Sequence, residues 1–452
     1  MSRSRHIVLL MLFLVWGTGR AEVLTIDSCL SMARRNNPEL RKAELSIRRA
    51  EQVKAQALTK YFPQVQATAF GYHALYPLVD VGIDDIGNAS VRDLLTTLYG
   101  NYGAALGLDN TINLFLHGYA VGVTAIQPVF VGGKIVAGNR LAQVGVEAAK
   151  LQAQMSERDI LEQVEESYWL VYGLLQKQQI IDRATALLDT VYTTVSEAVA
   201  AGLALPNDVA QVAIRRDEVA RQQLQLTSGM RLAKRALALS IGLANADSIV
   251  IAETNSTLTQ EWLLAENTGE SYEQQLLALQ VRAAELEKRM ALADALPQVA
   301  LGANYGYGHF QTNLLRDGLR SPNGNGAVFV TVNVPLTAWW ETGHKLREKQ
   351  YALEQARIDA DYLGSQLDLR TTQAYDQMND AAALVRIQRQ TVEHAEEAYR
   401  HTEANYQAGR ATVSDWLQAQ MTLTQAQSEL TDAQIAYRVR CRRYRDLVSG
   451  TK

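Results

Sequence analysis

The chain has 452 residues, with 7% aromatic residues, 8 prolines and a formal net charge of -4. Its length suffices for two or three ordinary domains, and the scarcity of aromatics and prolines favours long helices over a compact mixed fold. The mildly acidic charge argues against nucleic acid as a partner, because binding to phosphates needs clustered Lys and Arg.

The first 21 residues have the pattern of a secretory signal peptide. Arg3 and Arg5 precede an unbroken apolar run over residues 7–16, and small residues follow before Glu22. Ten apolar residues are too few to span a bilayer and are typical of a signal-peptide core, whereas a buried N-terminal helix is the alternative. Removing this segment takes away three arginines and no acid, so the formal charge becomes 41 - 48 = -7.

No later stretch approaches 18 continuous apolar residues, so the sequence predicts no transmembrane helix. An exported chain of this kind is either soluble in the periplasm or inserted in an outer membrane as β-strands, whose signal is weaker. Cys29 lies well past the apolar core and is predicted to be a helix residue and not a lipid-attachment site. A disulfide between Cys29 and Cys441 is left open by the sequence.

The remainder of the chain is predicted to be one unit repeated twice. Three pairs of residues share an offset of 207, and they are Pro128 and Pro335, Gly202 and Gly409, and Asp208 and Asp415. A single gapless register over about eighty residues indicates a duplication. The predicted units are residues 22–242 and 271–450, with residues 243–270 as a linker.

Each unit is predicted to contain a helix, a strand, a loop, a strand, a long helix, a turn and a helix. Upstream, Pro63 and Pro297 have an offset of 234, so the first unit holds 27 extra residues between its two proline landmarks. These extra residues fall in a connection rich in Gly and Asp, which is predicted to be an exposed loop.

The predicted strands alternate with period two. In the second unit the residues of one face are apolar or aromatic, whereas those of the other face are small or polar; the former are Val299, Leu301, Ala303, Tyr305 and Tyr307, then Val328, Val330, Val332 and Val334. This pattern fits strands with lipid on one side and water on the other. A half-buried strand of a soluble sandwich is the alternative.

Two long helices are predicted over residues 134–200 and 341–407. At 1.5 Å per residue each reaches roughly 100 Å, which exceeds the diameter of a compact domain of this size, so they are expected to lie against helices of similar length. A thin apolar stripe with coiled-coil-like spacing is predicted along the second helix, formed by Ala356, Ala360, Leu363, Leu367, Ala374, Met378, Ala381 and Leu384.

The similar stretches AGLALPND (201–208) and AGRATVSD (408–415) follow these helices. Gly202 and Gly409 are predicted to reverse the chain into a returning helix, because glycine has the necessary backbone freedom. Asp208 and Asp415 are predicted to cap free N–H groups near the start of that helix. Whether these carboxylates have a further role is left open at this point.

Four strands cannot close a barrel, and lipid tolerates no open sheet edge. If the strands lie in a membrane, several chains must therefore contribute to one barrel. Three chains would supply twelve strands, although this reasoning fixes only that there is more than one chain.

The chain resembles the TolC-like outer-membrane efflux proteins along nearly all of its mature length. The resemblance rests on the order and duplication of LTIDSCLSMARRNNPEL, FPQV, LPQV, QPVFVGGK and YQAGRATVSDWLQAQ. It implies a mainly α fold with a small β part, in which a duplicated helix–strand–strand–long helical hairpin forms a homotrimer. In that trimer a twelve-strand transmembrane β-barrel in outer-membrane lipid continues as a twelve-helix periplasmic α-barrel.

The resemblance also implies function. The chain would be the passive outer-membrane exit duct of a tripartite efflux or type I secretion system for drugs, other small molecules, metal ions or proteins. An inner-membrane pump would be coupled to the duct through a periplasmic adaptor protein.

The resemblance assigns roles to single residues at the two turns. Asp415 matches a carboxylate that rings the periplasmic aperture, and Gln418 occupies the position of a second acidic ring. Asp208 and Tyr406 match positions that tie neighbouring helices shut. Their usual basic partner falls at Ala411, so Arg410 is expected to substitute for it. The adaptor is expected to dock at Gly202, Leu203, Gly409 and Arg410.

Two other classes of protein fit the sequence less well. An enzyme is disfavoured because none of the seven histidines belongs to a metal-binding spacing and no phosphate loop or nucleophile elbow occurs. No catalytic residue, cofactor or metal is therefore expected. A periplasmic coiled-coil adaptor (membrane fusion) protein is the alternative, although it normally has one helical hairpin between β-rich domains.

Overall fold

The computed structural model describes residues 23–76, 78–106, 111–246, 249–252, 271–312, 319–320, 324–336 and 338–448. The predicted signal peptide and most of the predicted linker lie outside these residues. The described chain divides into two compact units. One is formed within residues 1–49, 147–279 and 357–452, and the other within residues 50–146 and 280–356.

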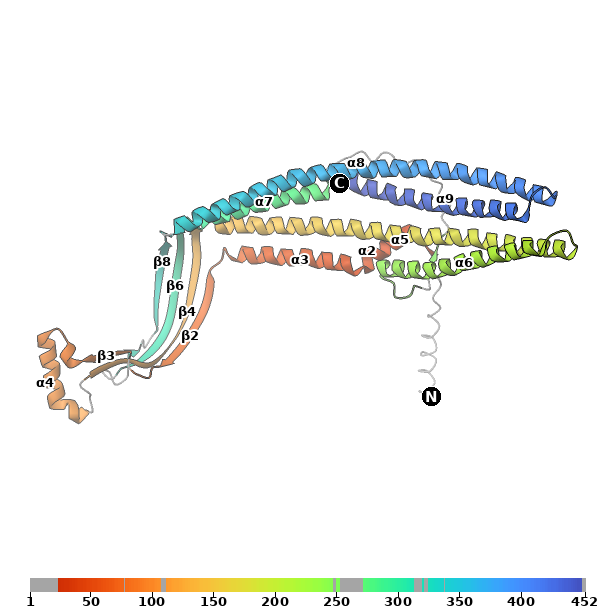
Figure 1. Ribbon diagram of the computed structural model, residues 1–452. Coiled ribbons are helices and arrows are strands. Elements are labelled where there is room, and N and C mark those ends of the chain that lie inside the picture. The colour runs from red at the N-terminus through yellow and green to blue at the C-terminus, as the bar shows by residue number, and fades with distance from the viewer. Residues whose placement is uncertain are drawn as a thin grey trace, which may run out of the picture. The chain divides into compact units, whose positions relative to one another are not determined.

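The long helices form two hairpins (Figure 1). The first hairpin consists of α5 (Lys134–Ala200) and α6 (Pro206–Ile241), and the second of α8 (Ala338–Gln407) and α9 (Val413–Val448). The two predicted long helices and both returns are therefore confirmed. None of the described helices combines the length and the apolar content needed to cross a bilayer.

The shorter helices are α2 (Ile26–Asn36), α3 (Pro38–Thr59) and α7 (Tyr272–Ala293). In α2, Cys29 is fully buried, which confirms the prediction that it is a helix residue, and burial raises the pKa of its thiol to about 11. Cys29 and Cys441 are both free thiols. Two short strands, β1 (Val23–Leu24) and β5 (Val250–Ile251), pair in parallel.

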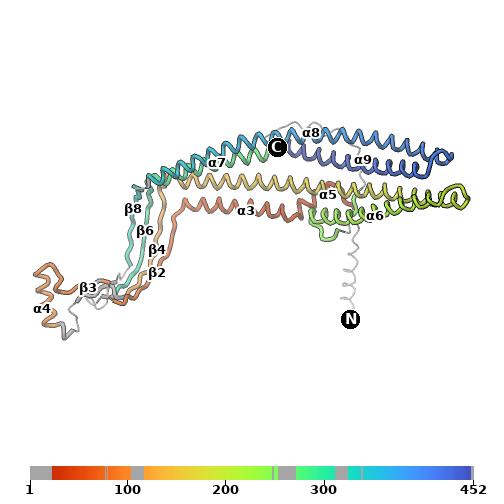
Figure 2. The backbone as a smooth tube through the Cα atoms, in the orientation of Figure 1, coloured from red at the N-terminus to blue at the C-terminus, as the bar shows by residue number. Residues whose placement is uncertain are grey.

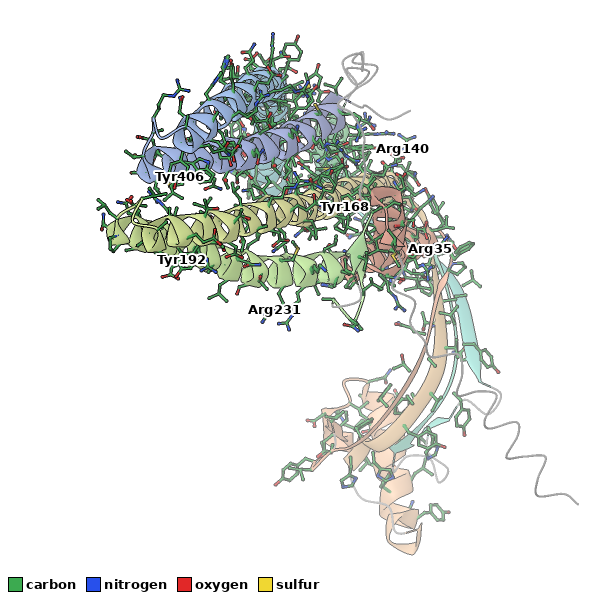
Figure 3. The ribbon with its side chains drawn as sticks, turned by 90° about the vertical axis from the view of Figure 1, so that its right-hand side faces the viewer. Arg35, Arg140, Tyr168, Tyr192, Arg231 and Tyr406 are labelled. Atoms are coloured by element: carbon green, nitrogen blue, oxygen red, sulfur yellow. The ribbon has the colours of Figure 1, made fainter. Side chains whose placement is uncertain are left out.

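In the first compact unit (within residues 1–49, 147–279 and 357–452), a hydrophobic core packs α2, β1 and β5 against α5 and α6. It consists of buried apolar side chains, among them Leu24, Cys29, Val164, Tyr168, Leu237, Ile241 and Ile251. Tyr168 is labelled in Figure 3. Gly242 ends α6 with a φ of 73°, and a Cβ at this position would lie 2.6 Å from the Cβ of Asn36. This close approach leaves room only for glycine.

The second compact unit (within residues 50–146 and 280–356) contains an antiparallel sheet, whose main strands lie side by side in Figure 2. They are β2 (Gln64–His73), β4 (Thr111–Val131), β6 (Gln298–Thr312) and β8 (Asn325–Asn333). The short strands β3 (Val79–Gly82) and β7 (Leu319–Arg320) pair with β4 and β6 respectively. The strand order is β2, β4, β6, β8, so the two halves of the chain meet where β4 pairs with β6.

The register confirms the predicted alternation of side chains. One face of the sheet, here called the apolar face, includes Val65, Ala67, Val121, Val123, Leu301, Ala303, Val328, Val330 and Val332. The opposite face, here called the polar face, includes Gln66, Thr68, Thr124, Asn304, Thr331 and Asn333. Several large residues of the apolar face are exposed in the single chain. An exposed apolar surface of this kind is typical of a face that contacts another protein or a membrane.

The extra residues of the first sequence repeat (residues 22–242) form regular structure, whereas an exposed loop was predicted. They include β3, the short 3-10 helix η1 (Ile83–Asp85) and the helix α4 (Ala89–Leu106). Helix α4 lies against η1, where Ile83 is buried. The loop was predicted from the high content of Gly and Asp. The same stretch also has apolar residues at helical spacing, because Val91, Leu94 and Leu98 are three and four residues apart.

The stripe predicted along α8 is partly wrong. Leu363 and Leu384 are 38% and 44% exposed, so they lie off the line of least exposed residues, whereas Ala374 and Met378 are buried on it. From Gly364 that line follows steps of three and four through Leu367, Thr371, Ala374, Met378, Ala381, Val385, Gln388, Val392, Ala395, Tyr399, Thr402 and Tyr406. The line includes polar residues such as Gln388, which donates to Glu429 of α9 at 3.4 Å.

Candidate functional site

The first hairpin turns at Gly202, which has a φ of 74°. The N–H of Leu203 donates to the carbonyl of Ala198 at 2.8 Å, and the N–H of Gly202 donates to the carbonyl of Val199 at 3.0 Å. This pair of bonds is a Schellman motif, which satisfies carbonyls that the end of a helix leaves free.

The second hairpin repeats this turn. Gly409 has a φ of 68°, the N–H of Arg410 donates to the carbonyl of Asn405 at 2.8 Å, and Gly409 donates to Tyr406 at 3.0 Å. No atom lies within 4 Å of the place where a Cβ would stand on Gly202 or Gly409. The left-handed backbone, and not a lack of space, is therefore the reason for glycine at both turns, as predicted.

Each returning helix is capped by the predicted carboxylate. Asp208 Oδ2 accepts from the N–H of Leu205 at 3.0 Å, and Asp415 Oδ2 accepts from the N–H of Thr412 at 3.0 Å. The second turn has a complete capping box, because Thr412 Oγ1 also accepts from the N–H of Asp415 at 3.1 Å. The side-chain and backbone hydrogen bonds from Thr412 hold the pKa of Asp415 below its ordinary value.

A cluster of apolar side chains joins the two hairpins close to their turns. Its buried members come from α5, α6 and α9, and they are Leu188, Val191, Val195, Val212, Val413, Trp416 and Leu417. Tyr406 of α8 stacks on Trp416 with 4.8 Å between the ring centroids. Tyr192 and Tyr406, both partly buried against this cluster, are labelled in Figure 3. The apolar contact fixes the two turns relative to each other within the chain.

The structure brings two of the predicted residues together. Burial raises the pKa of Tyr406, and the nearby charge of Asp208 raises it further. Arg410, which was expected to act as their basic partner, is exposed, and no described residue forms an ion pair with it. In the single chain the charge of Asp208 therefore acts on Tyr406 without an ion pair from Arg410.

A groove of about 470 Å³ lies beside the cluster, mainly between α6 and α9. Gln418 is exposed and lines it, together with Arg215, Glu218 and Glu429. Arg215 Nη1 and Glu218 Oε2 pair at 2.6 Å. The groove therefore combines these polar side chains with a largely apolar wall that includes Leu188 and Met421, and one of its lining residues, Gln418, is a predicted aperture residue.

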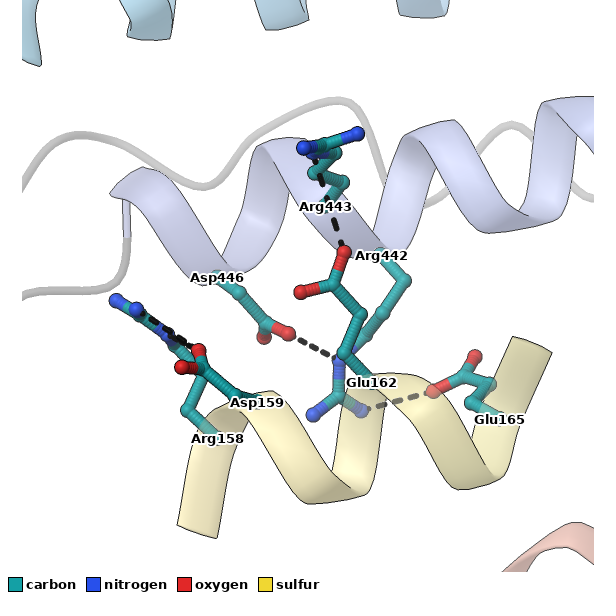
Figure 4. A network of polar contacts seen from close by, with 7 residues as sticks. All are labelled: Arg158, Asp159, Glu162, Glu165, Arg442, Arg443 and Asp446. Carbon is teal, nitrogen blue, oxygen red and sulfur yellow. Dashed lines mark hydrogen bonds and ion pairs between the residues drawn. The ribbon is translucent and has the colours of Figure 1, made fainter. Parts of the chain in front are cut away.

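An ion-pair network joins α5 to α9 in the same unit (Figure 4). Arg442 contacts Glu165 at 2.9 Å and Asp446 at 2.6 Å, and these three side chains are only 13–15% exposed. On α5, Arg158 contacts Glu273 of α7 at 2.8 Å. Burial alone would raise the pKa of Glu273, but the hydrogen bond and the charge of Arg158 lower it.

Sequence reasoning missed Thr412, Trp416 and Arg442. The spacing of Thr412 and Asp415 is that of a capping box and could have been recognised. Val413, Trp416 and Leu417 share one helical face directly after the turn, which is typical of a buried contact. Arg442 gave no such signal, because its partner Glu165 lies 277 residues away. No metal-binding group of three or more His, Cys, Asp or Glu occurs among the described residues.

A family model and a curated relative both connect this chain with export across the outer membrane. Residues 29–243 and 273–443 match the family described as Outer membrane efflux protein. The chain is 24% identical over 426 residues to the pyoverdine export outer membrane protein OpmQ of Pseudomonas aeruginosa, covering 91% of this chain and 82% of OpmQ.

Solved structures of low sequence identity share the fold. The outer membrane protein VceC of Vibrio cholerae is 19% identical with a TM-score of 0.73, covering 94% of this chain and 97% of VceC. The open state of the MtrE outer membrane channel of Neisseria gonorrhoeae is 16% identical with a TM-score of 0.71, covering 94% of this chain and 89% of MtrE. The chain is therefore an outer membrane protein that belongs to the outer membrane efflux protein family.

Proposed function

We propose that this protein is the passive exit duct of an efflux or secretion system, built from three copies of the chain. The observation that carries the proposal is the sheet with its four main strands, β2, β4, β6 and β8. Its apolar face is exposed, and within the described residues no further strand pairs with the outer edge of β2 or β8. In a membrane these edges need partners, because lipid offers nothing to bond their N–H and C=O groups.

Pairing β8 of one copy with β2 of the next satisfies both edges. Three copies of four strands give twelve, and three copies of the two helical hairpins give twelve helices. The apolar face then meets lipid, and the polar face meets the water inside the barrel. The helices continue the duct into the periplasm, to which the predicted signal peptide would export the chain.

Asp415 is proposed to form the ring at the periplasmic aperture. Its carboxylate is exposed and its pKa is lowered, so it is charged at neutral pH. Repetition of this charge around a narrow mouth favours cations. Gln418 adds no charge to the ring, and the neighbouring Asp208 and Tyr406 are proposed to help hold the mouth closed.

The turns are proposed to dock a periplasmic adaptor, which couples the duct to an inner-membrane pump. Leu203 is 84% exposed, and Gly202, Gly409 and Arg410 lie beside it or at the equivalent positions of the second turn. An exposed leucine at the end of a hairpin offers an apolar contact to a partner helix.

We propose that the duct exports a cargo, but we do not assign a particular compound. OpmQ is named for pyoverdine export, and from a relative of 24% identity we carry over export of a cargo and not that compound. Drugs, other small molecules, metal ions and proteins all remain within the proposal.

The deciding measurement is the mass of the detergent-extracted protein together with its conductance in a planar bilayer. A trimer with discrete, cation-selective channels would support the duct. A soluble monomer without conductance would overturn it and would favour a periplasmic coiled-coil adaptor instead.

A further inference from the structure

The apolar face of the sheet carries a band of aromatic and histidine side chains near the end of β2. The paired strands place His73 on β2, His117 and Tyr119 on β4, and Tyr307 and His309 on β6 on this one face. The rings of Tyr119 and His309 have centroids 5.9 Å apart. The histidines are the unusual members of this band, because an aromatic belt beside a membrane is made of Tyr and Trp.

His73 and His117 stand directly opposite each other. They are partners in the antiparallel register of β2 and β4, and their ring centroids lie 5.8 Å apart at an interplanar angle of 33°. The Nδ1 atom of His117 is buried and has no hydrogen-bond partner among the described residues. A buried ring nitrogen without a partner is costly, so it points to a ligand that would satisfy it.

The separation of the two rings suits a shared metal ion. Zinc–nitrogen bonds of about 2.0–2.1 Å place the centres of two imidazoles roughly 5 to 6.5 Å apart for ligand angles between tetrahedral and linear. The observed 5.8 Å lies within this range. Imidazole is a ligand for Zn²⁺, Cu²⁺ and Ni²⁺, whereas Mg²⁺ and Ca²⁺ prefer oxygen.

We propose that His73 and His117 form a two-histidine site for a divalent first-row transition metal ion, with water as the remaining ligands. His309 shares the face, but no group of three or more ligating residues occurs in the described chain, so the site has two protein ligands. Cu²⁺ should bind most tightly, following the general order of affinity for these ions. The site lies on the sheet, in the other compact unit from the hairpin turns, and is independent of the proposed duct function.

The site has a structural consequence for the inserted segment. His73 and His117 flank residues 74–116, which include β3 and α4. A bound ion would link the two strands at the base of this long segment, and a clip that closes a long loop restrains the unfolded chain. Occupancy should therefore raise the thermal midpoint of the protein.

The test uses the full chain in detergent, with any purification tag removed, titrated with Cu²⁺ and Zn²⁺ alone. Isothermal titration should give one tight ion per chain, and the electron paramagnetic resonance spectrum of the Cu²⁺ form should show coupling to two nitrogens. His73→Gln and His117→Gln should each weaken binding at least tenfold. His309→Gln and the distant His401→Gln are matched controls and should leave it unchanged.

Three results would overturn the site. They are binding that survives in the His73→Gln, His117→Gln double variant, binding that is lost in His401→Gln, and a Cu²⁺ spectrum with coupling to a single nitrogen. Thermal unfolding of each variant without metal shows whether its fold is intact. Conductance of the same samples is measured separately, so a failure of the duct proposal and a failure of the metal site can be told apart.

Discussion

At the end of β4, Gly132 and Gly133 both have left-handed backbones, with φ of 61° and 82°. They differ in their surroundings. A Cβ on Gly132 would lie 2.7 Å from the carbonyl oxygen and 2.9 Å from the Cα of Ala293, whereas a Cβ on Gly133 would have no neighbour within 4 Å. The backbone of α7 therefore passes so close to Gly132 that no larger residue fits.

This difference predicts unequal effects of alanine. Gly133→Ala should cost about 1–2 kcal/mol of stability for the left-handed backbone alone. Gly132→Ala should cost about 1–3 kcal/mol more, because the backbone of Ala293 has to move. Thermal unfolding of the two variants measures the difference, and equal midpoints would show that the approach of Ala293 is not a constraint.

Charge at the proposed aperture gives a second prediction at the scale of one residue. Asp415→Asn removes the charge but keeps an oxygen that can accept from the N–H of Thr412. It should therefore move the reversal potential in a salt gradient towards zero without loosening the turn. Gln418→Glu adds a carboxylate one turn further along α9 and should increase cation selectivity.

The pH dependence of this selectivity has a defined sign. The pKa of Asp415 is lowered by its bonds to Thr412, so the carboxylate keeps its charge as the pH falls through the ordinary range of Asp. Selectivity should therefore persist at pH values where an unperturbed Asp is half protonated. A wild-type reversal potential that does not differ from that of Asp415→Asn would contradict the aperture role.

At the scale of elements, the hairpins are held together by two kinds of contact. Near the turns the contact is apolar, through Val212, Trp416 and their neighbours. Further along, α5 and α9 are joined by Arg442 with Glu165 and Asp446. Because these charges are largely buried, they are stable only as a complete group.

The loss of Arg442 should therefore be costly. Arg442→Met removes the cation that pairs with both Glu165 and Asp446 and should destabilise the protein by about 3–5 kcal/mol. Lys42→Met is the control, because the pair of Lys42 and Glu39 is exposed and its removal should have little effect. If thermal unfolding shows equal small losses for both variants, the network does not hold the two helices together.

At the scale of the whole molecule, the sheet gives the chain a surface that one copy cannot cover. Val330 of the apolar face is 66% exposed, and the adjacent Thr331 of the polar face is exposed as well. In the proposed assembly these neighbours meet different solvents, since Val330 faces lipid and Thr331 faces the lumen.

Two matched lysine substitutions, one on each face of the sheet, test this difference. Val330→Lys should sharply reduce the yield of protein in the outer membrane, because a lysine on the lipid face costs about 2–4 kcal/mol at the midplane and recurs in every copy. Thr331→Lys should be tolerated. Membrane fractionation measures both variants, and equal yields would argue against lipid on the apolar face.

The sequence by itself determined the features that depend on near neighbours along the chain. The positive φ at Gly202 and Gly409 and the caps at Asp208 and Asp415 are made within a few residues. The two faces of the strands follow from the alternation of side chains alone. The motifs that carried the family resemblance are also short stretches, which is why the family could be recognised before the fold was known.

The tertiary structure alone decided which residues of distant elements stand opposite each other. The register of β2 on β4 brings His73 to His117, and the packing of α9 on α5 brings Arg442 to Glu165. The line of least exposed residues on α8 also runs through Gly364 and not through Leu363. Such pairings depend on how whole elements dock. The sequence of a helix or strand shows which of its residues share a face. It does not show which residue of another element will lie opposite them.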